Sequence, residues 1–371
     1  MKTIYTILIL AFIIAGTTSI MHAQGCVAVK SMGCSGQSSS TSLPKGQFEF
    51  VSNFRQFESF RHFVGDVEQK ERLELHTEVR INSFSYDVGF NYGVSDKFYI
   101  NLTVPYIDNS RSSNHYTDAK GVAQRFKVEA KGMGDVRISG YYNILTTLAN
   151  RKLSIVTGLG LKLPTGDDEV LDVFHALSSK KQDSTYIKPV DQAIQPGDGG
   201  WGVSLEAQLG YSLTSKLSTY VTGYYLIQPA TVSTTLYQRN LTGVDPTLAY
   251  LSICDQFLAR VGVAYSTGKW LFSLGGRVEG IPSSDLVGES TGRRRPGYIV
   301  DAEPGIGFSN GVDRINLNVP IAIYRNRTKS VYDLADPEGK RHGDAAFADY
   351  AISLGLVHTF GAPHADPIPM H

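Results

Sequence analysis

The feature that most constrains this chain is a period-two alternation of apolar and polar residues. In KLSIVTGLGLKLPTG, residues 152–166, Ile155, Leu159 and Leu161 fall on one side, and Gly160 and Lys162 fall on the other. Successive side chains of a β-strand point to opposite faces of its sheet, so this stretch predicts a strand with one leucine-rich face. Such a face must be covered by a second layer of protein or by lipid.

The alternation recurs along almost the whole chain. Most of the segments have roughly 10 to 15 residues, which is the length of a strand that crosses a membrane at a tilt. Roughly twelve segments are predicted, at 45–60, 73–94, 97–107, 134–146, 152–164, 200–213, 216–228, 255–266, 269–281, 296–309, 312–326 and 345–360.

The connections between these segments alternate in length. Tight turns with the sequences VSDK, TTLANR, LTSK, STGK and SNGVD follow every second segment. The intervening connections are long and polar, at 108–133, 165–199, 229–254, 282–295 and 327–344. Short turns at one end and long loops at the other are typical of outer-membrane β-barrels, with the short turns in the periplasm. A β-sandwich is the alternative, but its strands usually have only about 5 to 6 residues. We therefore predict an all-β transmembrane antiparallel barrel of about 12 strands, with lipid over its apolar face.

The start of the chain predicts export. Residues 1–23 combine a basic Lys2, an apolar run and a small-residue exit, which is the pattern of a secretory signal peptide. We expect a Gly/Ser-rich periplasmic segment at 24–44, the barrel at 45–360, and a short tail at 361–371. Two alternatives stay open for Cys26, which is either lipidated after lipoprotein processing or paired with Cys34 in a disulfide.

The composition narrows the partners. Basic and acidic residues number 35 each, so no basic field attracts nucleic acid. We expect no cofactor and no metal. The expected partners are outer-membrane lipid, a small-molecule solute and the barrel-assembly machinery, because the closing Phe360 resembles the signal that this machinery reads. The expected location is the outer membrane of a Gram-negative bacterium.

Three stretches resemble a known family. They are GMGDVRISGYYNIL at 132–145, GLGLKLPTGDDE at 158–169 and IQPGDGGWGVSLEAQLGYS at 194–212. Together they look like the outer-membrane barrel family named for the MetA pathway of phenol degradation, whose members are often labelled transporters. The resemblance implies a barrel that passes small, hydrophobic or aromatic compounds. It singles out no binding residue.

Charged residues are predicted on the inner face of the barrel. They would either pair across strands and stiffen the barrel, which we favour, or line a polar path for small solutes. Because eight strands are nearly filled by side chains and 16 to 18 leave a channel, about twelve predict a narrow or plugged passage. The candidate lumen-lining residues are Glu49, Arg55, Asp87, Lys97, Asp135, Arg137, Lys162, Glu206, Arg260, Arg277, Glu279, Asp301, Glu303 and Arg314.

The leading functional hypothesis is passive or gated passage of small molecules, without enzymatic activity. A structural or surface-binding barrel, whose long loops contact a partner, is the second hypothesis. A membrane-embedded lipid hydrolase is the third, but it needs a serine and a histidine placed together near the outer rim. No such pattern is recognisable in the sequence, so we predict no catalytic residues.

Overall fold

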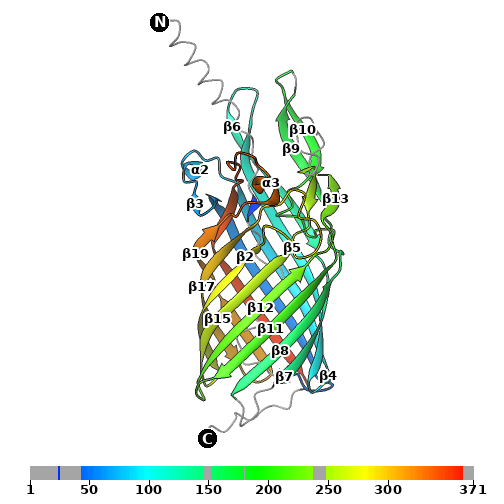
Figure 1. Cartoon of the computed structure of the whole chain (residues 1–371), viewed down its shortest axis with the longest axis vertical. Helices are drawn as coiled ribbons and strands as arrows, with labels where there is room; N and C mark the ends of the chain where they lie inside the picture. The colour runs from blue at the N-terminus through cyan, green and yellow to red at the C-terminus, as the bar shows by residue number, and fades with distance from the viewer. Residues whose placement is uncertain (1–23, 26–42, 146–151, 179, 237–247, 362–371) are drawn as a thin grey trace.

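The computed structural model describes residues 24–25, 43–145, 152–178, 180–236 and 248–361. Within them the chain forms a closed antiparallel barrel of 12 wall strands, two of which are interrupted (Figure 1). The wall is built, in chain order, from β2 (Phe48–Val64), β4 (Arg80–Ser95), β5 (Phe98–Thr117), β6 (Ala123–Met133) with β7 (Arg137–Leu145), β8 (Leu153–Lys162), β11 (Gly202–Ser212), β12 (Leu217–Ile227), β15 (Gln256–Thr267), β16 (Trp270–Ile281), β17 (Gly297–Ser309), β18 (Asp313–Asn318) with β19 (Ile321–Asn326), and β20 (Ala345–Phe360). The predicted fold class is confirmed.

The barrel closes between its first and last wall strands. Phe54 of β2 is the register partner of Tyr86 on β4 and of Leu354 on β20. The other wall strands pair antiparallel with their neighbours in the chain. Closure satisfies the backbone hydrogen bonds of what would otherwise be two free sheet edges, as a β-structure in hydrocarbon requires.

The alternation seen in the sequence becomes the two faces of the wall. On β8, Leu159 and Leu161 are 60% and 41% exposed on the outer face, whereas Ser154, Gly160 and Lys162 are buried. The outer face is therefore apolar and the inner face is polar, as expected.

The two ends of the barrel differ as predicted. Tight turns connect strands at 96–97, 213–216, 268–269 and 310–312, at the lower end of Figure 1. The turn predicted at 146–151 lies outside the described residues. At the upper end, the long connections carry elements of their own. These are β3 (Val67–Glu68), α2 (Glu71–Glu74), β9 (Leu171–Leu177), β10 (Asp183–Pro189), β13 (Val232–Leu236), β14 (Tyr250–Ser252) and α3 (Val331–Leu334).

Two predicted boundaries were wrong. The loop predicted at 108–133 is mostly strand, since β5 runs to Thr117 and β6 starts at Ala123. Along β6 the alternation has the opposite sense to the one expected for the wall, since Val128 and Ala130 are buried and Lys127 and Lys131 are exposed. The strand predicted from residue 73 starts at Arg80 instead, because 71–74 form α2 and His76 has a φ of 55°, which turns the chain.

Two wall strands are interrupted. Residues 134–136 separate β6 from β7, although both pair with β5. Residues 319–320 separate β18 from β19, where Pro320 has no N–H to give to a ladder. No helix in the described residues is long and apolar enough to cross a membrane. The short β1 (Gln24–Gly25) pairs parallel with Ala345 and Ala346.

Candidate functional site: the barrel interior and its mouth

All but one of the charged residues predicted for the inner face have buried or half-buried side chains. The buried ones are Glu49, Asp87, Asp135, Arg137, Lys162, Arg260, Arg277, Glu279, Asp301 and Glu303. Arg55, Glu206 and Arg314 are half-buried. Lys97 departs from the expectation because it lies in the turn between β4 and β5 with an exposed side chain. A period-two count says nothing about side-chain direction once the strand has ended.

An ion-pair network, here called the central lattice, crosses the interior between β2, β15, β16 and β17. Its members are Arg55, Arg260, Arg277, Glu279, Asp301 and Glu303. Glu279 accepts from Arg55 at 2.7 Å and from Arg277 at 2.5 Å. Glu303 lies 3.2 Å from Arg260 and 3.8 Å from Arg277. Asp301 is the register partner of Arg277 on the next strand. Three arginines therefore face three carboxylates.

The central lattice closes the interior at its level. Arg260 and Arg277 are each 2% exposed and Glu303 is 0% exposed. Charged groups buried to this degree must be paired, and they leave no water-filled channel beside them. The structure thus agrees with a plugged passage at this level rather than an open pore.

Glu49 holds a second network near the short turns. Its carboxylate accepts from Arg314 at 2.7 Å, from Asn91 at 2.9 Å and from the Thr359 hydroxyl at 3.1 Å. These partners come from β18, β4 and β20, so the network joins strands on both sides of the closure.

The three stretches that resemble the MetA-pathway family meet at one place on the wall. Lys162 binds Asp135 at 3.2 Å and also contacts Asp198. Asp135 in turn accepts the Gly166 N–H at 3.0 Å, and the Gly197 N–H donates to the Asp167 carbonyl at 2.9 Å. The motifs therefore build a junction where β6, β8 and the chain entering β11 come together. Sequence spacing could not show that they touch.

Glycine is required at this junction by close backbone contact. A Cβ on Gly197 would lie 2.3 Å from the Gly166 carbonyl oxygen and 2.5 Å from its carbon. Neither atom can move without moving the chain. The glycines in PTG and QPG thus let two turns cross in direct contact.

We expect Gly197→Ala to lower the free energy of unfolding by roughly 1–3 kcal/mol, the usual cost of overpacking. Gly223→Ala is the matched control, because a Cβ on Gly223 meets no atom within 4 Å. Guanidinium unfolding in detergent, followed by the fluorescence of the chain's 2 tryptophans, measures both variants. Equal stability of the two would mean that the Gly166–Gly197 crossing is not tight.

Residues 189–200 fold inward at the upper end of the barrel, and most of them are buried. Val190 and Ile194 are 0% exposed and pack with Val79, Val128 and neighbouring apolar side chains of β4 and β6. Asp191 lies 3.3 Å from Arg295 and 3.9 Å from Arg111. We call these residues the inward segment. It covers the interior from above.

A cavity of about 440 Å³, here called the mouth cavity, lies beside the inward segment. Its walls are β5, β6 and the β9–β10 hairpin. The lining residues include Tyr116, Phe126, Phe174, His175 and Tyr186 together with Arg111 and Lys188. The sequence analysis missed this site, because 108–133 was predicted to be loop and the hairpin was not foreseen.

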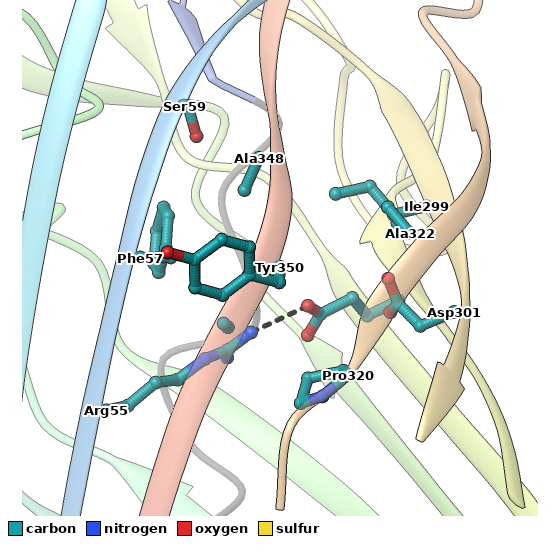
Figure 2. Close-up of a pocket in the computed structure, with 11 residues that line it drawn as sticks. Arg55, Phe57, Ser59, Ile299, Asp301, Pro320, Ala322, Ala348 and Tyr350 are labelled. Atoms are coloured by element: carbon teal, nitrogen blue, oxygen red, sulfur yellow. Dashed lines mark hydrogen bonds and ion pairs between the residues drawn. The ribbon is translucent and has the colours of Figure 1, made fainter. Parts of the chain in front are cut away.

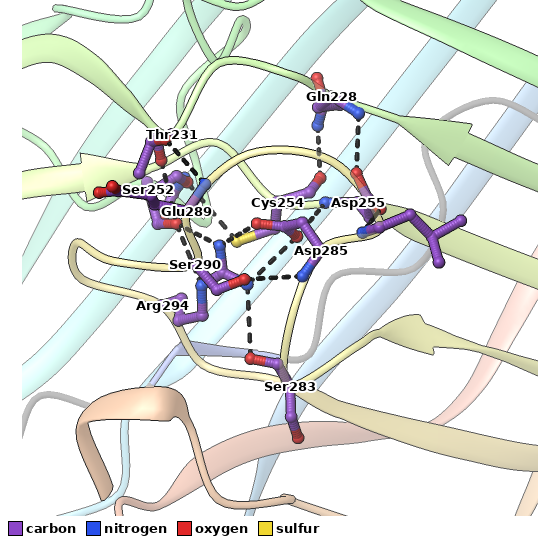
Figure 3. A network of polar contacts seen from close by, with 12 residues as sticks. Gln228, Thr231, Ser252, Cys254, Asp255, Ser283, Asp285, Glu289, Ser290 and Arg294 are labelled. Carbon is purple, nitrogen blue, oxygen red and sulfur yellow. Dashed lines mark hydrogen bonds and ion pairs between the residues drawn. The ribbon is translucent and has the colours of Figure 1, made fainter. Parts of the chain in front are cut away.

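Polar contacts tie two of the long connections together at the same end (Figure 3). Arg294 binds Ser252 at 2.8 Å and Asp285 at 3.1 Å, and Asp285 also accepts the Asp255 N–H at 2.9 Å. Burial raises the pKa of the Cys254 thiol in this network to about 11, so it stays protonated near neutral pH. The two alternatives for Cys26, lipidation or a disulfide with Cys34, fall on residues outside the described ones.

The wall has a seam between β19 and β20, shown in Figure 2. Ile321 and Tyr350 form the one register pair that joins these strands. Beyond this pair, the Arg325 side chain of β19 joins the two strands, because it donates to the Ala348 carbonyl at 3.0 Å and to Asp349 at 2.5 Å. A cavity of about 20 Å³, enough for about one water, lies behind the seam. The seam is therefore closed by side chains rather than by a ladder.

Among the described residues, no group of three or more His, Cys, Asp or Glu side chains is placed to hold a metal ion. We therefore assign no metal centre to these residues.

Comparison with known proteins agrees with this architecture. The family model described as "Putative MetA-pathway of phenol degradation" matches residues 48–177. This confirms the resemblance, whose first two motifs lie in the matched range and whose third lies beyond it. Among curated proteins, none matches this chain in sequence.

Solved structures also resemble the chain. An outer membrane channel from Pseudomonas putida F1 has a TM-score of 0.57 at 12% identity, covering 89% of this chain and 100% of that one. The Pseudomonas putida toluene transporter TodX has a TM-score of 0.45 at 11% identity, covering 92% and 100%. At these identities, the first similarity establishes the fold.

Proposed function

We propose that this chain, similar over residues 48–177 to the MetA-pathway family, is a gated outer-membrane barrel for small molecules. One observation carries the proposal: an apolar outer wall encloses an interior that is closed by ion pairs, and an aromatic-lined cavity lies at the end of the barrel that carries the long connections. A purely structural barrel has no need for such a cavity.

The placement of the chain follows from the same wall. The apolar outer face suits lipid, and closed barrels are the β-structures that hydrocarbon tolerates. We propose that residues 1–23 are the signal peptide, that 24–44 form a periplasmic segment and that 361–371 form a tail. The expected contacts with lipid and the barrel-assembly machinery belong to this proposal, as does the fate of Cys26.

The charged inner-face residues act as the gate in this proposal. The side chains of the central lattice are buried inside the barrel, so passage past them along the axis requires them to move. The resemblance favours small hydrophobic or aromatic solutes, and the aromatic mouth cavity is compatible with them. We propose no catalytic activity.

The test is reconstitution of the full chain. In planar bilayers, we expect brief, low-conductance openings rather than a steady current, because the resting interior is closed. In liposomes, we expect influx of a small uncharged aromatic such as phenol to exceed that into empty liposomes. Absence of both conductance and phenol influx under every condition would overturn the proposed function.

A further inference from the structure

The mouth cavity combines two properties that together define a ligand class. Its volume of about 440 Å³ lies within the usual range of small-molecule sites, about 300 to 1,000 Å³. It is formed between the β5–β6 extension and the β9–β10 hairpin, which contact each other above the wall. Size and position suit a single small solute arriving from outside.

The first property is a set of aromatic faces. The rings of Phe126 and His175 are stacked with centroids 3.6 Å apart and planes at 10°. Tyr116 meets Phe126 edge-on at 5.3 Å. Phe174 and Tyr186 of the hairpin form a second pair at 5.9 Å. All five line the cavity, so a planar ring entering it meets partners for stacked or edge-to-face contact.

The second property is positive charge. Arg111 and Lys188 line the cavity, and no carboxylate is found among its described lining residues. Arg111 lies 3.9 Å from the Asp191 carboxylate, which also lies 3.3 Å from Arg295. The Asp191 carboxylate is therefore shared between Arg111, which lines the cavity, and Arg295, which does not.

The environment of Lys188 reflects the positive charge of the cavity. Its Nζ lies 4.5 Å from the centre of the Phe174 ring, which places the ammonium over the ring. Burial lowers the pKa of Lys188, attraction to Asp191 opposes this change, and repulsion from Arg111 and Arg293 adds to it, so that the pKa is lowered overall. An anion bound here would offset the effects of burial and repulsion, because it would give the ammonium an opposite charge.

We propose that the mouth cavity is a binding site for aromatic monocarboxylates, with the ring among the aromatic side chains and the carboxylate at Lys188 and Arg111. This inference rests on the proposed function and names the class of solute that the barrel captures before passage. An uncharged aromatic ligand would contact only the aromatic side chains. An aliphatic acid would contact only Lys188 and Arg111.

The experiment is calorimetric titration of the purified full chain in detergent with benzoate, benzyl alcohol and cyclohexanecarboxylate. We expect benzoate to bind at least about tenfold more tightly than either analogue, since each lacks one of the two recognised features. Lys188→Gln should weaken benzoate binding by at least about tenfold and leave benzyl alcohol unchanged. Phe126→Leu should weaken both aromatic ligands.

Lys180→Gln is the matched control, because Lys180 is exposed at the tip of the same hairpin and outside the lining. It should bind benzoate like the wild type, and circular dichroism of each variant checks that the barrel is folded. Equal binding of benzoate and benzyl alcohol, no benzoate binding, or no effect of Lys188→Gln in a folded barrel would overturn the inference.

The two proposals fail separately. Phenol influx into liposomes without benzoate binding to the same preparation overturns this inference alone. Benzoate binding with the expected response to Lys188→Gln supports the inference even if no influx or conductance is seen, which would contradict the proposed function instead.

Discussion

Replacing Arg277 by methionine is expected to destabilise the barrel by roughly 3–5 kcal/mol, the usual cost of removing one partner of a buried ion pair. Arg277 is 2% exposed and contacts both Glu279 and Glu303. Without it, three carboxylates face two arginines in a closed interior. Guanidinium unfolding of the reconstituted chain measures the loss.

The double variant Arg277→Met with Glu279→Gln separates charge from packing. In the double variant, the positive charges of Arg55 and Arg260 equal in number the negative charges of Asp301 and Glu303. The double variant should therefore recover part of the lost stability. Planar-bilayer recordings of both variants should show larger or longer openings than the wild type, because the central lattice has lost the ion pairs of Arg277. A single variant as stable as the wild type would mean that the lattice is not a closed, charge-balanced network.

Replacing Asp191 by asparagine is expected to release the inward segment. Asp191 is 2% exposed, and its loss leaves Arg295 and Arg111 without their shared carboxylate, again at a cost of roughly 3–5 kcal/mol. Because this segment covers the interior from above, we also expect a higher conductance. The control is Asp167→Asn, because Asp167 lies in the same long connection and its side chain is exposed. Unchanged stability and conductance would show that Asp191 does not anchor the segment.

The contribution of Asp191 should depend on pH in a defined direction. Burial alone would raise the pKa of its carboxyl, but the charges of Arg295 and Arg111 outweigh burial and hold the pKa well below its usual range. A depressed native pKa stabilises the fold fully above the unfolded value of about 3.9 and progressively less below it. The stability difference between wild type and Asp191→Asn should therefore be constant near neutral pH and shrink below about pH 4.

The wall of the barrel was predictable because its rule is local. The alternation on β8 predicted that Leu159 and Leu161 point outward and that Lys162 points inward. The same period-two pattern located nearly every wall strand. It failed where that rule does not apply. Lys97 lies in a turn. Along β6 the buried residues are apolar and charged residues lie between them, which reverses the pattern expected for the wall.

The interior and the mouth were only partly predictable. The inner-face charges were foreseen as a set, but their partners were not, because Arg55 and Glu279 are brought together by barrel closure across most of the chain. The mouth cavity was missed entirely. Its aromatic side chains come from two separate hairpins, and no short-range pattern indicates that Phe126 and His175 stack.

The sequence by itself determined the number of wall strands, their order, the apolar outer face and the end at which the long connections lie. Each of these follows from a period of two and from the length of a turn, which neighbouring residues set. Only the tertiary structure decided which charges pair, that residues 189–200 fold inward, and that a cavity opens beside them. Those features depend on closing the sheet, which brings residues far apart in the chain to within a few ångströms.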